Sequence, residues 1–219
     1  MDVLERARLH AALADPHRLA IVDALALGDR TPQGLARFVG VPTNLLAHHL
    51  GVLEAVGLVT RRVSEGDGRR RYVVLRPDRL PEPVTPAGVP PGIPLFVCTH
   101  NSARSQFAAA LWRRLTGKAA ESAGADPATR VHPGAVRAAA RLGTPLGEAT
   151  PRGYDAVGQA PSLVVSVCDR AYEAGVPFRV PGFHWSVPDP VPDCRQPAFL
   201  AAFADISARV DRLAGALLS

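Results

Sequence analysis

The sequence predicts an α/β protein in two parts. Short helices and a hairpin come first, and the second part opens with a strand, a polar loop and a helix. Three observations lead to this prediction. Helix-start and helix-stop residues alternate along the first part, six prolines interrupt the chain between residues 80 and 95, and an apolar run at 93–97 leads directly into a polar loop. A chain of 219 residues can form one large core or two small ones.

The composition, with 47% hydrophobic and 21% charged residues, is typical of a soluble protein. No apolar run approaches the roughly 20 residues of a membrane helix, and the N-terminus lacks the apolar stretch of a signal peptide. We therefore expect a cytoplasmic protein with no membrane partner. The net charge of +5 is compatible with nucleic-acid binding, and five arginines lie within residues 61–71.

Helix signals in the first part predict three successive helices. Asp15-Pro16 and Thr31-Pro32 each combine an N-cap residue with proline at the first helical position, and Gly28 and Gly40 end the two helices. A third helix is expected over 42–57, and the tight turn before it predicts a helix-turn-helix. The runs 58–63 and 69–75 then bracket a glycine-containing turn, which predicts a hairpin with an arginine-rich tip.

The stretches 12–22 and 45–59 are similar to the ArsR-type winged-helix repressors, and the resemblance extends over about residues 4–76. It implies a homodimer whose recognition helices enter successive major grooves of palindromic operator DNA. The residues expected to meet the groove are Thr43, Asn44, Leu45 and His48, and those expected to hold phosphates are Arg62, Arg69 and Arg70.

This part departs from its relatives in two ways. No cysteine precedes Cys98, so arsenite cannot be captured there through sulfur, and the proline-rich segment replaces a C-terminal helix that often supports dimerisation. Dimerisation would then depend on the first helix or on the second domain. Histidines 10, 17, 48 and 49 are conceivable metal ligands, but no carboxylate–histidine spacing stands out, and we expect no metal site.

The proline-rich segment at 80–92 predicts a stiff linker between a DNA-binding domain at 1–79 and a second domain at 93–219. A proline-rich surface loop within a single domain is the alternative.

The loop after the apolar run 93–97 carries Cys98 and Arg104, separated by five residues and followed by a helix at 107–115. Backbone N–H groups of such a loop can cradle a tetrahedral oxyanion, the helix dipole adds attraction, and an arginine closes the cradle. The same field favours the thiolate, so Cys98 is the candidate nucleophile. A buried cysteine with an arginine downstream by chance is the alternative. The loop residues expected to bind the oxyanion are Thr99, His100, Asn101, Ser102, Ala103, Arg104 and Ser105.

Residues 93–219 resemble the low-molecular-weight tyrosine phosphatase superfamily, within its arsenate reductase branch. The similar stretches are 97–106, 121–125, 131–133, 163–169 and 184–190. The resemblance implies a doubly wound, four-stranded parallel sheet with the oxyanion loop at the end of its first strand. By position, Asp189, which precedes a proline, is the acid that protonates the leaving group, and Asp193 is its rival. Asn101 would organise the loop, and Ser105 would stabilise the Cys98 thiolate.

A reductase needs a second thiol to release arsenite from the Cys98 adduct, and Cys168 stands at the matching position. The third thiol of the thioredoxin-coupled enzymes is replaced by Gly175. A Cys98–Cys168 disulfide reduced directly, attack by a small-molecule thiol, and participation of Cys194 remain open. We expect no bound cofactor, only an external reductant such as thioredoxin or a low-molecular-weight thiol.

Three functions fit these features. The first is an arsenic-responsive regulator fused to an arsenate reductase. The second is a one-component repressor whose phosphatase-like domain only senses arsenate or phosphate. The third is a phosphatase acting on phosphotyrosine or small esters, for which an aromatic content of 5% offers few rim residues.

Overall fold

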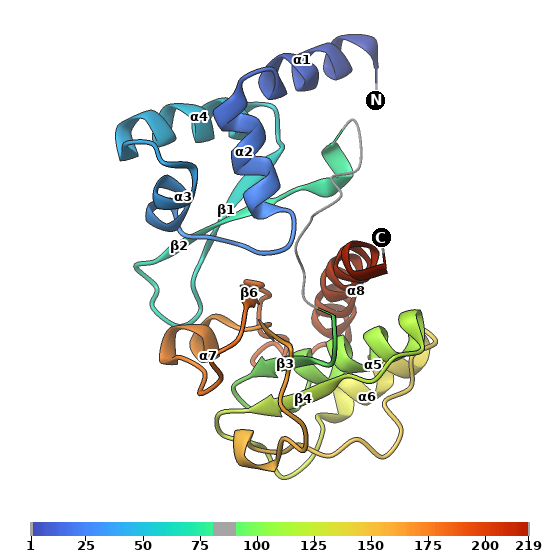
Figure 1. Ribbon diagram of the computed structural model, residues 1–219. Helices are drawn as coiled ribbons and strands as arrows, with labels where there is room; N and C mark the ends of the chain where they lie inside the picture. The colour runs from blue at the N-terminus through green and yellow to red at the C-terminus, as the bar shows by residue number, and fades with distance from the viewer. Residues whose placement is uncertain (1, 81–90, 219) are drawn as a thin grey trace. The chain divides into compact units, whose positions relative to one another are not determined.

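The computed structural model describes residues 2–80 and 91–218, in two compact units (Figure 1). One unit comprises Met1–Ser64 and Gly68–Pro86, and the other comprises Glu65–Asp67 and Ala87–Ser219. Most of the expected linker at 80–92 lies outside the described residues, so its stiffness stays a prediction. No helix in the described ranges is both long enough and apolar enough to cross a bilayer.

Four helices and a hairpin build the first unit. The elements are α1 (Val3–Leu13), α2 (Pro16–Leu25), α3 (Pro32–Val39), α4 (Thr43–Ala55), β1 (Val59–Val63), β2 (Arg71–Leu75) and the short 3-10 helix η1 (Pro77–Arg79). The expected caps are present: Asp15 accepts hydrogen bonds from two backbone N–H groups of α2, and Thr31 accepts one from α3. Gly40 ends α3 with a φ of 75°, which favours glycine. The second hairpin strand begins at Arg71, two residues later than expected.

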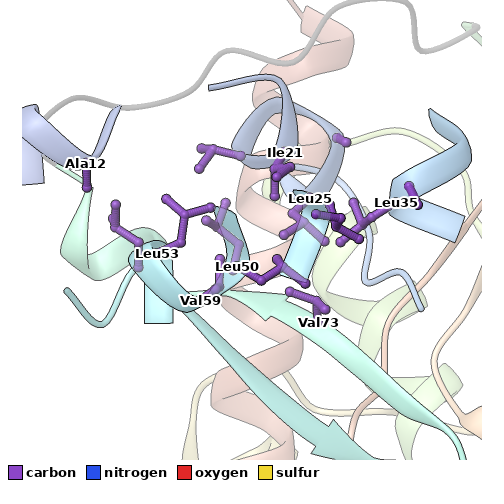
Figure 2. Close-up of a cluster of buried hydrophobic side chains, with 14 of the residues drawn as sticks. Ala12, Ile21, Leu25, Leu35, Leu50, Leu53, Val59 and Val73 are labelled. Carbon is purple, nitrogen blue, oxygen red and sulfur yellow. The ribbon is translucent and has the colours of Figure 1, made fainter. Parts of the chain in front are cut away.

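The core of the first unit lies where the helices meet the hairpin, and Figure 2 shows side chains from each of them converging. Leu50 and Leu53 of α4 pack there with Ile21 of α2, Leu35 of α3 and Val73 of β2. The buried positions of α4 recur at helical spacing, which leaves its opposite face exposed. The helix-turn-helix prediction is therefore confirmed by the arrangement of α3 and α4.

A four-stranded parallel sheet forms the centre of the second unit, with strand order β4-β3-β5-β6. Its elements are β3 (Pro94–Cys98), α5 (Arg104–Thr116), β4 (Glu121–Gly124), α6 (Pro133–Arg141), η2 (Tyr154–Ala156), β5 (Leu163–Ser166), α7 (Asp169–Ala174), β6 (Gly182–His184) and α8 (Gln196–Leu218). The predicted α/β class and doubly wound sheet are confirmed. Helix α5 begins at Arg104 rather than Phe107, so the arginine lies in the first helical turn.

Alternate residues of β3 face opposite sides of this sheet. Phe96 packs near Trp112 of α5 and Trp185, and Figure 1 shows α8 running beside α5 and α6. On the other face, Leu95 and Val97 belong to a cluster that includes Tyr154. Helix α7 also contacts β3 and β5. Because both faces are covered, the two central strands β3 and β5 are fully buried, and their carboxyl ends are left to carry the polar residues.

Candidate active site

The strand order reverses between β3 and β5, since the chain passes from β3 to one neighbour and then crosses to the other. Ligands of open parallel sheets bind at such a switch point, beyond the carboxyl ends of the strands. Cys98 is the last residue of β3, and Cys168 follows the end of β5 by two residues. The topology thus brings together two thiols that lie far apart in the sequence.

The sulfur of Cys98 receives hydrogen-bond donors from its own loop. The backbone N–H of Asn101 donates to Sγ at 3.2 Å, and the hydroxyl oxygen of Ser105 lies 3.0 Å from it. Cys98 is 4% exposed and Ser105 is fully buried. Donors held in place around a buried sulfur stabilise its anionic form, which is the nucleophilic one.

Asn101 holds the loop in shape from a strained backbone conformation with a φ of 48°. Its side-chain nitrogen donates to the Ser105 hydroxyl at 2.8 Å, and its side-chain oxygen accepts from the backbone N–H of Arg152 at 3.0 Å. The side chain of Gln106 donates to both the backbone and the side-chain oxygen of Asn101. The fully buried amide therefore fixes the position of the hydroxyl that contacts Cys98.

Gly124, at the end of β4, lets the loop approach the neighbouring strand. A Cβ atom there would lie 2.5 Å from the carbonyl oxygen of Thr99 and 2.8 Å from the backbone nitrogen of Asn101. Both are backbone atoms that cannot turn aside, so only glycine fits this position.

Arg104 is 4% exposed and points its guanidinium at the segment after β6. One terminal nitrogen donates to the carbonyl oxygen of Val187 at 2.8 Å, and the other lies 3.1 Å from a carboxylate oxygen of Asp189. Burial alone would lower the pKa of Arg104. The surrounding acidic groups, Asp189 among them, outweigh burial and raise its pKa above the ordinary value. Arg104 is thus a permanent cation beside both thiols.

The two candidate acids lie in different surroundings. Asp189 is mostly buried and faces Arg104, so the structure brings it to the loop. Asp193 is paired with Arg195 at 3.0 Å, and that arginine is exposed. Of the two, Asp189 is therefore the one placed to give a proton to a group leaving from Cys98.

Cys168 is fully buried and lies against the loop. Its sulfur is 3.2 Å from the Thr99 hydroxyl oxygen and accepts a hydrogen bond from the backbone N–H of Ala171 at 3.3 Å. Burial raises the pKa of the Cys168 thiol, although the charge of Arg104 and the Thr99 hydroxyl act in the other direction. Cys168 is thus held as a neutral thiol next to the nucleophile's loop.

The remaining loop residues differ in their surroundings. His100 is exposed, and its Nδ1 lies 2.9 Å from the carbonyl oxygen of Asp126. The carbonyl oxygen of Ser102 accepts from the backbone N–H of His132, and Ala103 is buried at the start of α5. His100, Ser102 and His132 line a pocket of about 540 Å³ that also contacts Val191. The pocket therefore lies beside the loop, and neither Cys98 nor Arg104 lines it.

The third thiol position and Cys194 lie outside this arrangement. Gly175 ends α7 with a φ of 84°, a conformation that suits glycine better than cysteine. Cys194 is exposed, has a φ of 56°, and donates from its sulfur to the Val191 carbonyl oxygen at 2.7 Å. All three cysteines are free thiols.

Sequence reasoning missed two features of this site. The hydroxyl of Tyr154 is buried without a hydrogen-bond partner among the described residues, and burial above all raises its pKa to about 12. Asp169, which directly follows Cys168, forms a buried pair with His184, and a carboxylate oxygen lies 2.9 Å from Nε2 of the imidazole. Burial favours the protonated carboxyl, but the hydrogen bond from His184 helps to lower the pKa of Asp169 overall. Cys98 and its loop could be predicted from a short stretch of sequence. Tyr154, Asp169 and His184 could not, because only the fold brings them to the site.

The residues predicted to contact DNA lie on α4, on β1 and just before β2. Thr43, Asn44, Leu45 and His48 are all exposed on α4. Arg62 on β1 is half-buried, while Arg69 and Arg70 are exposed just before β2.

Comparisons with known proteins first define the class. Residues 13–62 match the family model of the helix-turn-helix domain, and residues 94–219 match that of the low molecular weight phosphotyrosine protein phosphatase. The second match covers more than half of the chain. An α/β phosphatase-type fold with its cysteine at the first strand end is therefore joined to a helix-turn-helix.

The chain belongs to the low molecular weight phosphotyrosine protein phosphatase family. It is 33% identical to an arsenate reductase of Brevibacillus brevis over 54% of this chain and 91% of that protein. A solved arsenate reductase of Archaeoglobus fulgidus is 34% identical, with a TM-score of 0.49, over 56% of this chain and 98% of the other. A solved YwlE mutant of Bacillus subtilis is 19% identical, with a TM-score of 0.52, and the match covers 59% of this chain and 100% of the other.

Proposed function

We propose that this chain is an arsenic-responsive transcriptional regulator fused to a thiol-dependent arsenate reductase. The observation that carries the enzymatic part is the meeting of Cys98, Arg104 and Cys168 at the switch point of the sheet, because Thr99, next to Cys98, contacts the second thiol. A phosphatase needs only one of these thiols. The similarity to the Brevibacillus brevis protein supports the same assignment.

In the proposed reaction, the Cys98 thiolate attacks arsenate and forms a sulfur–arsenic(V) bond, while a hydroxyl group leaves as water with a proton from Asp189. The Cys168 thiolate then attacks the sulfur of Cys98. The sulfur–arsenic bond breaks, its electron pair stays on arsenic, and arsenite leaves. Two thiols are oxidised to one Cys98–Cys168 disulfide as arsenic is reduced from the pentavalent to the trivalent state. A dithiol protein of the thioredoxin class or a low-molecular-weight thiol then reduces the disulfide.

The regulatory part of the proposal depends on the helix-turn-helix. In it, two copies of the chain bind operator DNA as a homodimer in the cytoplasm. Helix α4 reads the groove through Asn44 and its exposed neighbours, and Arg69 and Arg70 hold phosphates. The family match to residues 13–62 supports DNA binding.

The enzymatic proposal is tested by arsenite production from arsenate with dithiothreitol, and with thioredoxin and its reductase. We expect the wild type and Cys194→Ser to turn over, and Cys98→Ser and Cys168→Ser to be inactive in steady state. Cys194→Ser is a matched control because it removes a thiol outside the site. Equal activity in Cys168→Ser and wild type would remove the two-thiol mechanism.

A phosphatase is the second candidate, and the pocket beside His100, together with Asp189, favours it. A phosphate ester would form a phosphocysteine at Cys98, which water cleaves. Steady hydrolysis of p-nitrophenyl phosphate that is retained in Cys168→Ser and lost in Cys98→Ser supports this activity. Absence of hydrolysis in the wild type excludes it.

A further inference from the structure

Three side chains of the first unit meet where the start of α2 lies beside α4. The ligand atoms of Asp15, His17 and His49 all lie within 4.8 Å of one another, and no other such cluster of metal-ligand types occurs in residues 2–80 and 91–218. The Nδ1 atoms of His17 and His49 are each 3.7 Å from the same carboxylate oxygen of Asp15. The two imidazole rings stack, with centroids 5.2 Å apart.

His49 is the unusual member of this cluster. It is 4% exposed, yet neither ring nitrogen has a hydrogen-bond partner within the described part of the chain. Buried polar atoms are almost always paired, so an unpaired buried imidazole needs another explanation. A neutral imidazole has one ring nitrogen with a free lone pair, and that nitrogen can bind a metal ion.

Asp15 already has its orientation fixed. As the N-cap of α2 it accepts from the backbone N–H groups of His17 and Arg18 at 2.9 and 3.1 Å. The Arg18 side chain lies 3.9 Å from the second carboxylate oxygen, but its Nε donates to the Ala12 carbonyl oxygen instead. The carboxylate is therefore held in place by these backbone hydrogen bonds and still has lone pairs to offer a metal ion.

We propose that Asp15, His17 and His49 bind a divalent transition-metal ion of the zinc type, with two imidazole nitrogens and one carboxylate oxygen. Ligands about 2.0–2.1 Å from a tetrahedral zinc ion stand about 3.3 Å apart, close to the 3.7 Å found here for each histidine and Asp15. The fourth position is open to water, since His17 is half-exposed. Such an ion ties the start of α2 to α4. The sequence predicted no metal site because the carboxylate and His49 meet only in the folded chain.

The test is a Co²⁺ titration of the full-length protein, followed by visible absorption. We expect one equivalent to bind with d–d bands, and His17→Ala and Asp15→Asn to weaken binding at least about tenfold. Asparagine keeps the N-cap, and His17 is exposed enough to truncate without disturbing the core. His48→Ala and His10→Ala are matched controls that remove neighbouring exposed imidazoles and should bind Co²⁺ as the wild type does.

The titration also separates this site from the thiols. No Co²⁺ binding by the wild type, or unchanged affinity in both His17→Ala and Asp15→Asn, overturns the proposal. An intense near-ultraviolet sulfur-to-cobalt band that disappears in Cys98→Ser overturns it as well, because the ion would then sit at the catalytic loop. Circular dichroism of each variant confirms that it is folded.

Discussion

The hydroxyl oxygen of Thr99 lies 3.2 Å from the sulfur of Cys168, although the two residues belong to loops that follow different strands. This contact brings the second thiol to the first residue of the oxyanion loop. Burial raises the pKa of Cys168, so the thiol is protonated at neutral pH and must ionise before it can attack. Resolution of the Cys98 adduct, rather than its formation, is then expected to limit reduction near neutrality.

This pKa predicts a pH dependence. Below the pKa of Cys168 the thiolate fraction grows about tenfold per pH unit, so arsenite production at saturating reductant should rise steadily from pH 7 to pH 9. Hydrolysis of p-nitrophenyl phosphate uses no second thiol and should not share this rise. The two profiles, measured on one preparation, provide the check. A flat reductase profile would contradict the role given to Cys168.

Replacing Asp189 with asparagine removes the proton donor and the negative charge beside Arg104. We expect kcat to fall about 10²-fold or more, in line with the loss of a general acid, while phosphate binds at least as tightly because one negative charge beside Arg104 is gone. Asp193→Asn is the matched control and should change neither quantity, because Asp193 is paired with Arg195 away from the loop. An equal fall in kcat in the two variants would contradict the assignment of Asp189 as the proton donor.

The loop depends on Asn101 for its stability. Asn101→Ala removes the amide that contacts the Ser105 hydroxyl and accepts from the N–H of Arg152, and it removes one acceptor of Gln106. It also places alanine at a positive φ. The cost should be about 3 kcal/mol in the free energy of unfolding of the second unit, measured by urea titration. Asn101→Gly relieves the φ strain and should recover part of the lost stability. Both variants lack the amide that holds Ser105, so we expect neither to turn over arsenate as the wild type does. Wild-type stability in the alanine variant would show that these bonds are not needed.

The sequence predicted this loop because its information is local: a buried strand, a cysteine, an arginine and a helix follow one another without interruption. The same holds for the helix starts at Asp15 and Thr31, where the cap and the proline are adjacent. Tyr154 and the buried Asp169–His184 pair were not predicted, because their neighbours are set by sheet order. The approach of His49 to Asp15 was not predicted because it depends on how α4 packs beside the start of α2.

The first unit offers a stability prediction of its own. Leu50 of α4 is 1% exposed and packs in the core that Figure 2 shows, so Leu50→Ala should destabilise this unit by about 3 kcal/mol. Leu45, on the exposed face of the same helix, is the matched control, and Leu45→Ala should change stability little. Thermal unfolding monitored at 222 nm distinguishes the two. If Leu45→Ala is the more damaging variant, the face assigned to DNA is wrong.

The central claim is that Cys98 and Cys168 act as one redox pair, and peptide mass mapping after a single turnover tests it most directly. The reduced protein is mixed with arsenate without added thiol, quenched with an alkylating agent and digested. The account predicts one Cys98–Cys168 disulfide for each arsenite released, with Cys194 alkylated. Arsenite released while Cys168 remains fully alkylated, or a Cys98–Cys194 disulfide in its place, would contradict it.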